Sequence, residues 1–279
     1  MIMRIMKIVF VLMLCQIGTA MGDEAKLIQL SRESGVKIIS QAGNSSGSGF
    51  FIGDQYVVTC FHVVAKISSV PDGKGNNTVN WTIFSDLRVL LPSGETINGT
   101  VITVPTQADP SPLFGDFAII KLGNKPTKSF SKLTLAAVGE KQEVGDTVVF
   151  SGYPLATPGM VTHRGMISGS DSAGDVIFIQ AAINKGNSGG ALLNADGHAI
   201  GVVSNREGGI SQGLSELSAY IDRTSSQGSV QIMGVDPLQS TKAIVQTLDQ
   251  YISTGIGYAR SIRFAREYIE KNPKLLDDK

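Results

Sequence analysis

Three side chains that together can cleave an amide or ester bond occur along the chain in the order histidine, aspartate, serine. Ser188 lies in the segment Asn184–Leu193, whose glycines allow a tight turn that exposes the hydroxyl and points backbone N–H groups at a developing oxyanion. His62 follows the apolar run Tyr56–Thr59, and an imidazole titrates near neutral pH, which suits a general base. Asp116 opens another apolar run, where a carboxylate is costly to bury unless it is hydrogen-bonded. These residue types predict nucleophilic catalysis through an acyl-enzyme.

The turn before Ser188 also predicts an oxyanion hole. We expect the backbone N–H groups of Gly186 and Ser188 to bind the oxyanion, aided by Asn187. A turn rich in glycine and serine is common by itself, so its meaning depends on its partners. The chain has only 3 histidines, and the combination of one of them with Asp116 and Ser188 favours a catalytic role over a structural one.

Two other hydrolytic or metal chemistries fit less well. Residues 186–190 also match the G-x-S-x-G elbow of α/β-hydrolases, but that elbow leads into a helix and precedes its acid and its histidine. Here only His198 follows, two residues after Asp196, and we expect it to be an exposed turn residue. Because the histidines are scattered and no His-Glu-x-x-His pattern is present, we expect no metal site and no cofactor.

Cys60 and His163 each have a functional and a plain interpretation. Cys60 could be a nucleophile beside His62, but residues so close along a strand face different surroundings, which favours a small core residue. His163 either lines a specificity pocket for acidic residues or has a plain strand or loop role. Nothing near it in the sequence supports such a pocket, so we favour the second interpretation.

Short apolar runs separated by turn residues dominate the chain from Val36 to about Ile221, and their spacing near ten residues predicts an antiparallel all-β sandwich or barrel. The expected strands are Val36–Ile39, Gly49–Ile52, Tyr56–Thr59, Val79–Phe84, Arg88–Leu91, Phe117–Leu122, Thr147–Ser151, Val176–Ala181, Ala191–Leu193 and Ala199–Ser204. An Asp-Gly pair in Asn194–Gly197 predicts a hairpin between the last two.

The pattern changes after Asp222. Residues 223–228 are polar and predict a loop or linker. A helix is expected next, because Asp236 suits an N-cap, Pro237 suits the first helical position, and apolar residues then recur at helical spacing. A second helix is expected from about Tyr258 to Glu270, so residues 223–279 are interpreted as a linker and C-terminal helices.

Composition and the amino terminus limit the class of protein. Over 279 residues, 24 Lys+Arg and 24 Asp+Glu cancel, which argues against nucleic-acid binding. Residues 1–20 combine early basic residues, a short apolar run and a small-residue cleavage site, which is typical of a secretory signal peptide. An uncleaved anchor is disfavoured because the apolar run is too short. We therefore expect a secreted or periplasmic protein with no stable membrane span after cleavage.

The motifs around His62, Asp116 and Ser188 resemble those of the chymotrypsin-like or trypsin-like serine peptidases, and within them the HtrA/Deg-type branch. The resemblance rests on segments 47–64, 115–122 and 181–190. It implies two antiparallel six-stranded β-barrels within residues 25–222, divided near 125–135. The first barrel would supply His62 and Asp116 and the second Ser188. It also implies an endopeptidase acting on proteins or peptides, mainly unfolded ones, and leaves a homo-oligomer open.

Two departures from the wider family matter. The Ile-Val-Gly-Gly segment that pairs with an acid before the serine is missing, and Asn187 stands where that acid would be. The residues after Asp222 have a helical pattern, so no PDZ domain is expected. A catalytically silent peptide-binding or chaperone-like module on the same fold remains the alternative.

Specificity follows from the resemblance alone. The residue six before the serine, Ala182, would lie at the base of the primary pocket, with Ile183, Val202 and Val203 on or near its walls. An apolar pocket predicts broad preference for small or medium aliphatic residues. A preference for charged residues would instead point to Asp175, Arg206 or His163.

Overall fold

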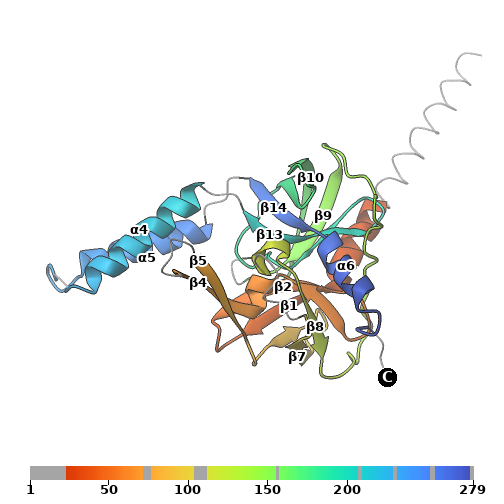
Figure 1. The fold of residues 1–279 in the computed structure, drawn as a ribbon, viewed down its shortest axis with the longest axis horizontal. Helices are drawn as coiled ribbons and strands as arrows, with labels where there is room; N and C mark the ends of the chain where they lie inside the picture. The colour runs from red at the N-terminus through yellow and green to blue at the C-terminus, as the bar shows by residue number, and fades with distance from the viewer. Residues whose placement is uncertain are drawn as a thin grey trace, which may run out of the picture.

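Two closed, six-stranded antiparallel barrels form the body of the molecule (Figure 1), and this confirms the predicted fold class. The computed structural model describes residues 23–71, 77–103, 112–154, 157–206, 209–228, 231–251 and 255–276. The predicted signal peptide, residues 1–20, lies outside the described residues. Among the helices that are described, none has the length and apolar character needed to cross a membrane.

The first barrel is built from strands whose apolar side chains fill its interior. In chain order these are β1 (Gly35–Ser40), β2 (Ser45–Phe51), β3 (Tyr56–Thr59), β6 (Arg88–Leu90), β7 (Thr96–Val101) and β8 (Ala118–Leu122). They close in the order β1-β2-β3-β8-β7-β6. A separate two-stranded sheet, β4 (Ala65–Pro71) and β5 (Asn77–Ile83), and the short helical turns α2 (Phe61–Val64) and α3 (Pro112–Gly115) lie between these strands in the sequence.

The second barrel begins at Thr147, after a segment without long strands that follows β8. Its strands are β9 (Thr147–Gly152), β10 (Val161–Ser170), β11 (Val176–Gln180), β12 (Ala191–Leu193), β13 (Ala199–Arg206) and β14 (Ile256–Ser261), closed in the order β10-β11-β14-β13-β12-β9. The predicted hairpin between β12 and β13 is confirmed: Gly197 adopts φ 80° and donates its N–H to the Asn194 carbonyl. A helix over residues 23–34 precedes β1, and its Ser31 hydroxyl donates to the Ser151 hydroxyl of β9 at 2.8 Å.

The carboxyl-terminal part differs from the sequence-based division at Asp222. β14 closes the second barrel by pairing with both β11 and β13, so the barrel continues to Ser261. The helix expected from Tyr258 begins only at Arg263, as α6 (Arg263–Lys271). The apolar residues of β14 and of α6 together show a helical spacing, because the strand is short and the helix follows it almost directly. The sequence pattern therefore predicted one helix where the structure has a strand and then a helix.

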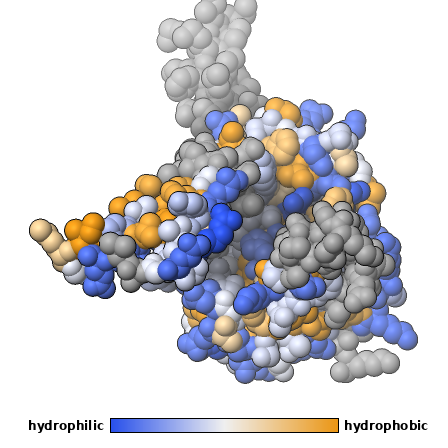
Figure 2. Space-filling model, turned by 60° about the vertical axis from the view of Figure 1, so that its left-hand side comes forward, coloured by the Kyte–Doolittle hydropathy of each residue, from blue (hydrophilic) through white to orange (hydrophobic). Residues whose placement is uncertain are grey.

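Helices α4 (Gly209–Ser225) and α5 (Pro237–Tyr251) are therefore an insertion between β13 and β14 and not a terminal extension. They pack against each other as a hairpin that projects away from the barrels (Figure 1), and Ile221 and Val245 are buried within it. The predicted N-cap is confirmed, since Asp236 accepts the N–H groups of Leu238 and Gln239 at 2.8 and 3.2 Å. We call this hairpin the helical arm, and apolar side chains are visible on its surface (Figure 2).

The arm should be dispensable for folding of the barrels. The ends of β13 and β14 already face each other, with Arg206 in register with Gly257. Replacing residues 207–256 by Asn-Gly, which favours a tight hairpin, should leave one cooperative thermal transition with a midpoint within about 4 °C of the intact chain. Circular dichroism would measure it, and a six-residue Gly-Ser loop at the same place controls for turn strain. Loss of the cooperative transition in both variants would contradict this assignment.

Candidate active site

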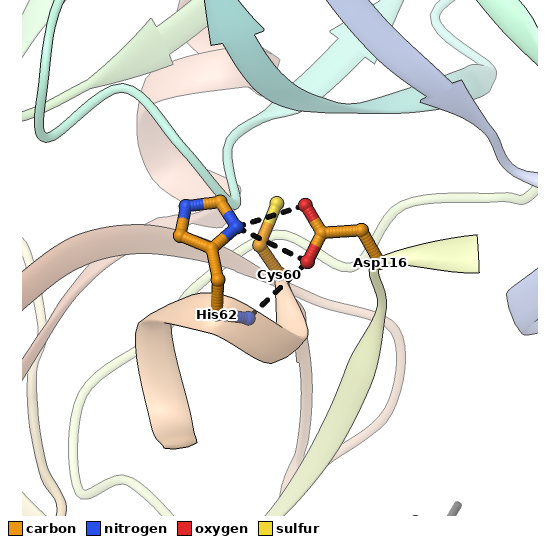
Figure 3. Close-up of side chains that lie close together, drawn as sticks. All are labelled: Cys60, His62 and Asp116. Carbon is orange, nitrogen blue, oxygen red and sulfur yellow. Dashed lines mark hydrogen bonds and ion pairs between the residues drawn. The ribbon is translucent and has the colours of Figure 1, made fainter. Parts of the chain in front are cut away.

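The structure brings His62 and Asp116 into direct contact (Figure 3). His62 lies in the helical turn α2, immediately after β3, and Asp116 precedes β8, the strand that pairs with β3. The imidazole Nδ1 lies 2.8 Å and 3.1 Å from the two carboxylate oxygens of Asp116, and the backbone N–H of His62 donates to the same carboxylate at 3.2 Å. Asp116 is held at φ 40°, a left-handed conformation that few residues other than glycine adopt.

Ser204 is a buried residue of β13, and its role at the site was not identified from the sequence. Its hydroxyl donates to Asp116 Oδ2, so the second barrel supplies a partner for a carboxylate of the first. A serine inside an apolar strand, in the run Ala199–Ser204, was the available signal, because a buried hydroxyl needs a partner. With Ser204 and His62 both bonded to it, the Asp116 side chain is buried without being left unpaired.

His62 and Asp116 shift each other's pKa in opposite directions. Burial disfavours the imidazolium, but the charge of Asp116 and its hydrogen bond outweigh burial and raise the pKa of His62 above its ordinary value. Burial also disfavours the carboxylate, but the nearby His62 and the hydrogen bonds from His62 and Ser204 lower the pKa of Asp116. The arrangement therefore favours an ionised Asp116 beside a basic imidazole.

Ser188 lies on the turn before β12, but its hydroxyl is not bonded to His62 among the described residues. The Ser188 Oγ instead donates to the backbone carbonyl of Ser204 at 2.6 Å. Ser204 thus accepts from Ser188 through its carbonyl and donates to Asp116 through its side chain. Ser204 therefore connects Ser188 to Asp116. Of the two hydrogen bonds that a triad requires, the structure shows the one between His62 and Asp116.

Ser48, in β2, fixes the glycine turn from the opposite barrel. Its hydroxyl donates to the Gly186 carbonyl at 2.6 Å and accepts the N–H of Tyr153 at 3.0 Å, and its own N–H donates to the Ser188 carbonyl at 2.8 Å. The role of Ser48 could not be recognised from the sequence, because its partner Gly186 lies 138 positions away in the chain. The turn is therefore held in place by backbone and hydroxyl bonds that cross between the barrels.

Backbone geometry leaves two of the expected oxyanion donors unused. Gly186 has φ 102°, and a Cβ there would lie 2.1 Å from the Tyr153 carbonyl oxygen, so only glycine fits without displacing backbone. In the part of the chain that the structure describes, the N–H groups of Gly186 and Ser188 have no acceptor. Asn187 differs, because its N–H donates to the Asn184 carbonyl at 3.0 Å and its side chain is fully buried.

The four residues expected to bind substrate are not alike in the structure. Ile183, Val202 and Val203 are buried in the core of the second barrel, whereas Ala182 is exposed. Ala182 belongs to a groove of about 550 Å³. Its lining consists of Ser168, Gln180, Ala181, Ala182, Gly255 and Ile256.

Three further residues were considered as determinants of a preference for charged substrate residues, and the structure gives two of them other contacts. Asp175 is buried and forms an ion pair with Arg263 of α6, and the side chain of Arg206 lies outside the described residues. His163 lies in β10 and stacks on Phe150 with ring centroids 4.8 Å apart, and burial lowers the pKa of its imidazole.

Two sequence interpretations need correction. His198 is on the predicted turn but is half-buried, with Nδ1 3.2 Å from a carboxylate oxygen of Glu140, because the turn folds onto that residue. Cys60 is buried as expected, but it does not face different surroundings from His62. Since β3 ends at Thr59 and the chain turns helical at Phe61, the Cys60 sulfur lies on the same side as the imidazole (Figure 3).

Comparisons with known proteins agree with this geometry. A family model of the trypsin-like peptidase domain matches residues 47–202. A probable periplasmic serine endoprotease, DegP-like, of Brucella suis is 33% identical over 223 residues, which cover 73% of this chain and 38% of that protein. The putative protease Do-like 14 of Arabidopsis thaliana is 31% identical over 188 residues, covering 63% of this chain and 39% of that protein. The chain thus spans less than half the length of these curated relatives.

Solved structures support the same fold. The serine endoprotease from Yersinia pestis matches with a TM-score of 0.55 and 19% identity, covering 88% of this chain and 65% of that one. The HtrA-type protease AlgW, solved with a tripeptide, matches with a TM-score of 0.55 and 20% identity, covering 91% and 63%. Since the family model spans more than half of the chain and relatives of the DegP type match it, this chain belongs to the trypsin-like peptidase domain family.

Proposed function

We propose that this protein is a serine endopeptidase that cleaves peptide bonds of protein substrates through His62, Asp116 and Ser188. The observation that carries the proposal is the contact of the half-buried His62 imidazole with the buried Asp116 carboxylate, together with a glycine turn whose Gly186 and Ser188 N–H groups have no acceptor within the described chain. Membership in the trypsin-like peptidase domain family supports it. The relatives named as periplasmic serine endoproteases support a secreted or periplasmic location.

Each residue has a role that its contacts can support. His62 Nε2 takes the proton of the Ser188 hydroxyl as Oγ attacks the substrate carbonyl, and later gives it to the leaving amine. Asp116 holds the proton on Nδ1 and so keeps Nε2 free to accept. The N–H groups of Gly186 and Ser188 stabilise the oxyanion, and water then hydrolyses the acyl-enzyme. The first step needs a rotation of the Ser188 side chain from the Ser204 carbonyl toward His62.

Substrate class follows from the groove that contains Ala182. Because Ala182 brings no charge and its groove is lined partly by Ala181 and Ile256, we propose small or medium aliphatic residues before the cut. An apolar pocket discriminates by only about 1–3 kcal/mol per methylene, so preference should be broad and unfolded segments should be the main substrates.

The second candidate is a silent peptide-binding module. It is favoured by one observation, the hydrogen bond of the Ser188 hydroxyl to Ser204 instead of His62. The two candidates differ in a single measurable property, because a silent module binds denatured protein without cutting it.

Digestion of a denatured protein tests the proposed activity. The purified chain should cut at many positions, mostly after Val, Ala or Ile, and Ser188→Ala should lower turnover by about 10⁴- to 10⁶-fold, because no nucleophile remains. Mass spectrometry of the fragments measures both, and Ser45→Ala is a matched control on β2, since its hydroxyl donates to Val63 within the first barrel. Binding without cleavage by a folded wild-type chain would instead identify the silent module.

The pH profile should report the neighbour of His62. Activity requires the neutral imidazole, and Asp116 raises the pKa of His62, so kcat/KM should increase with pH through a value above the ordinary one of about 6.5. Asp116→Asn removes the charge that raises the pKa of His62 but leaves the imidazole buried. The rise of kcat/KM should therefore occur at lower pH, and its value on the high-pH plateau should fall about 10⁴-fold. Identical limbs in the two proteins would refute the assigned role of Asp116.

Ser48 should act on turnover through the turn that it holds. Ser48→Ala leaves the Tyr153 N–H without its acceptor and the Gly186 carbonyl without its donor. This should lower the free energy of unfolding by about 1–3 kcal/mol. If this loosens the oxyanion hole, kcat should fall by roughly 10- to 100-fold with a smaller change in KM. Ser45→Ala is again the control on the same strand. Equal kinetics for the two variants would show that Ser48 does not position the turn.

A further inference from the structure

Cys60 is a thiol that the proposed mechanism does not use, although it lies beside the catalytic pair (Figure 3). Its sulfur donates to the Val203 carbonyl at 3.2 Å and is completely buried. The Cys60 Sγ, a ring nitrogen of His62 and a carboxylate oxygen of Asp116 all lie within 4.8 Å of one another. A thiol, an imidazole and a carboxylate are thus gathered on one side of the active site.

These three groups form a donor set that zinc favours. Zinc binds thiolate sulfur at about 2.3 Å and imidazole nitrogen or carboxylate oxygen at about 2.0–2.2 Å, usually with four ligands. Donors within 4.8 Å of one another need only small side-chain rotations to share one ion. The His62 side chain is 36% exposed, so one member of the otherwise buried cluster is accessible to solvent.

Charge balance also suits a dication. With a metal bound, the thiolate and the Asp116 carboxylate together carry two negative charges, which neutralise Zn²⁺ in a site where an unpaired charge would be costly.

We propose that Cys60, His62 and Asp116 form an inhibitory binding site for a thiophilic divalent cation, with Zn²⁺ as the ion tested. On binding, the Cys60 Sγ–H and the His62 Nδ1–H each lose a proton. One proton is taken up by Nε2 and the other leaves to solvent. The imidazole then presents Nε2–H to Ser188 and cannot accept its proton, so the metal-bound form is inactive. This consequence for activity rests on the proposed peptidase function, whereas the binding itself does not.

Cobalt spectroscopy tests the binding without any assay of peptidase activity. The chelator-treated protein is titrated with Co²⁺, and a thiolate-to-cobalt charge-transfer band should rise to one ion per chain and disappear when Zn²⁺ is added. Cys60→Ser replaces only the sulfur atom by oxygen and so removes the thiolate, and the band should be absent. Its Zn²⁺ affinity should fall by more than the roughly 10- to 100-fold that loss of an outer-shell partner causes. Cys60→Ala is the second variant, and thermal unfolding checks that both remain folded.

A matched control is the His198–Glu140 pair, a histidine and a carboxylate at 3.2 Å that the cluster does not include. His198→Ala should leave the cobalt band unchanged. In the activity arm, Zn²⁺ should inhibit the wild-type protein reversibly, with recovery on adding a chelator, and should not inhibit Cys60→Ser relative to its own zinc-free rate. A wild-type chain with no thiolate band, or equal zinc inhibition with and without Cys60, would overturn the proposal. An inactive protein that still shows the Cys60-dependent band would refute only the peptidase function.

Discussion

The buried carboxylate of Asp116 is the constraint on which the site depends. A buried carboxylate is stable only when hydrogen bonds and an opposite charge replace the water it has lost. One barrel cannot meet this need, because His62 comes from the first barrel and Ser204 from the second. The two barrels must therefore pack in one relative position for Asp116 to stay ionised. In that position the Ser188 hydroxyl donates to the carbonyl of Ser204, the residue whose own hydroxyl donates to Asp116.

Ser48 adds a second connection of the same kind. It joins β2 of the first barrel to Gly186 and Ser188 of the second, directly at the turn that supplies the oxyanion donors. The hydrogen bonds of Ser48 and Ser204 thus join the barrels where the chemistry is proposed, and the helical arm begins at the end of β13, the strand that carries Ser204.

Sequence reasoning identified residues whose chemistry is evident locally and missed those defined by distant partners. His62, Asp116 and the strands around them could be predicted because glycine turns and apolar runs are local signals. The partners of Ser204 and Ser48 could not be predicted, since they lie 88 and 138 positions away in the chain. β14 was missed because the apolar residues of a short strand and of α6 together mimic one helix. Cys60 was misplaced because the helical turn at Phe61 was not expected.

The central claim is that the Asp116–His62 pair activates the Ser188 hydroxyl, and covalent labelling tests it most directly. The folded chain is treated with a fluorophosphonate, and the modified peptide is located by mass spectrometry. We expect a single adduct on Ser188, which forms rapidly in the wild-type protein and much more slowly in His62→Ala. Absence of label on Ser188 in a chain shown to be folded, or equal labelling rates with and without the imidazole, would contradict it.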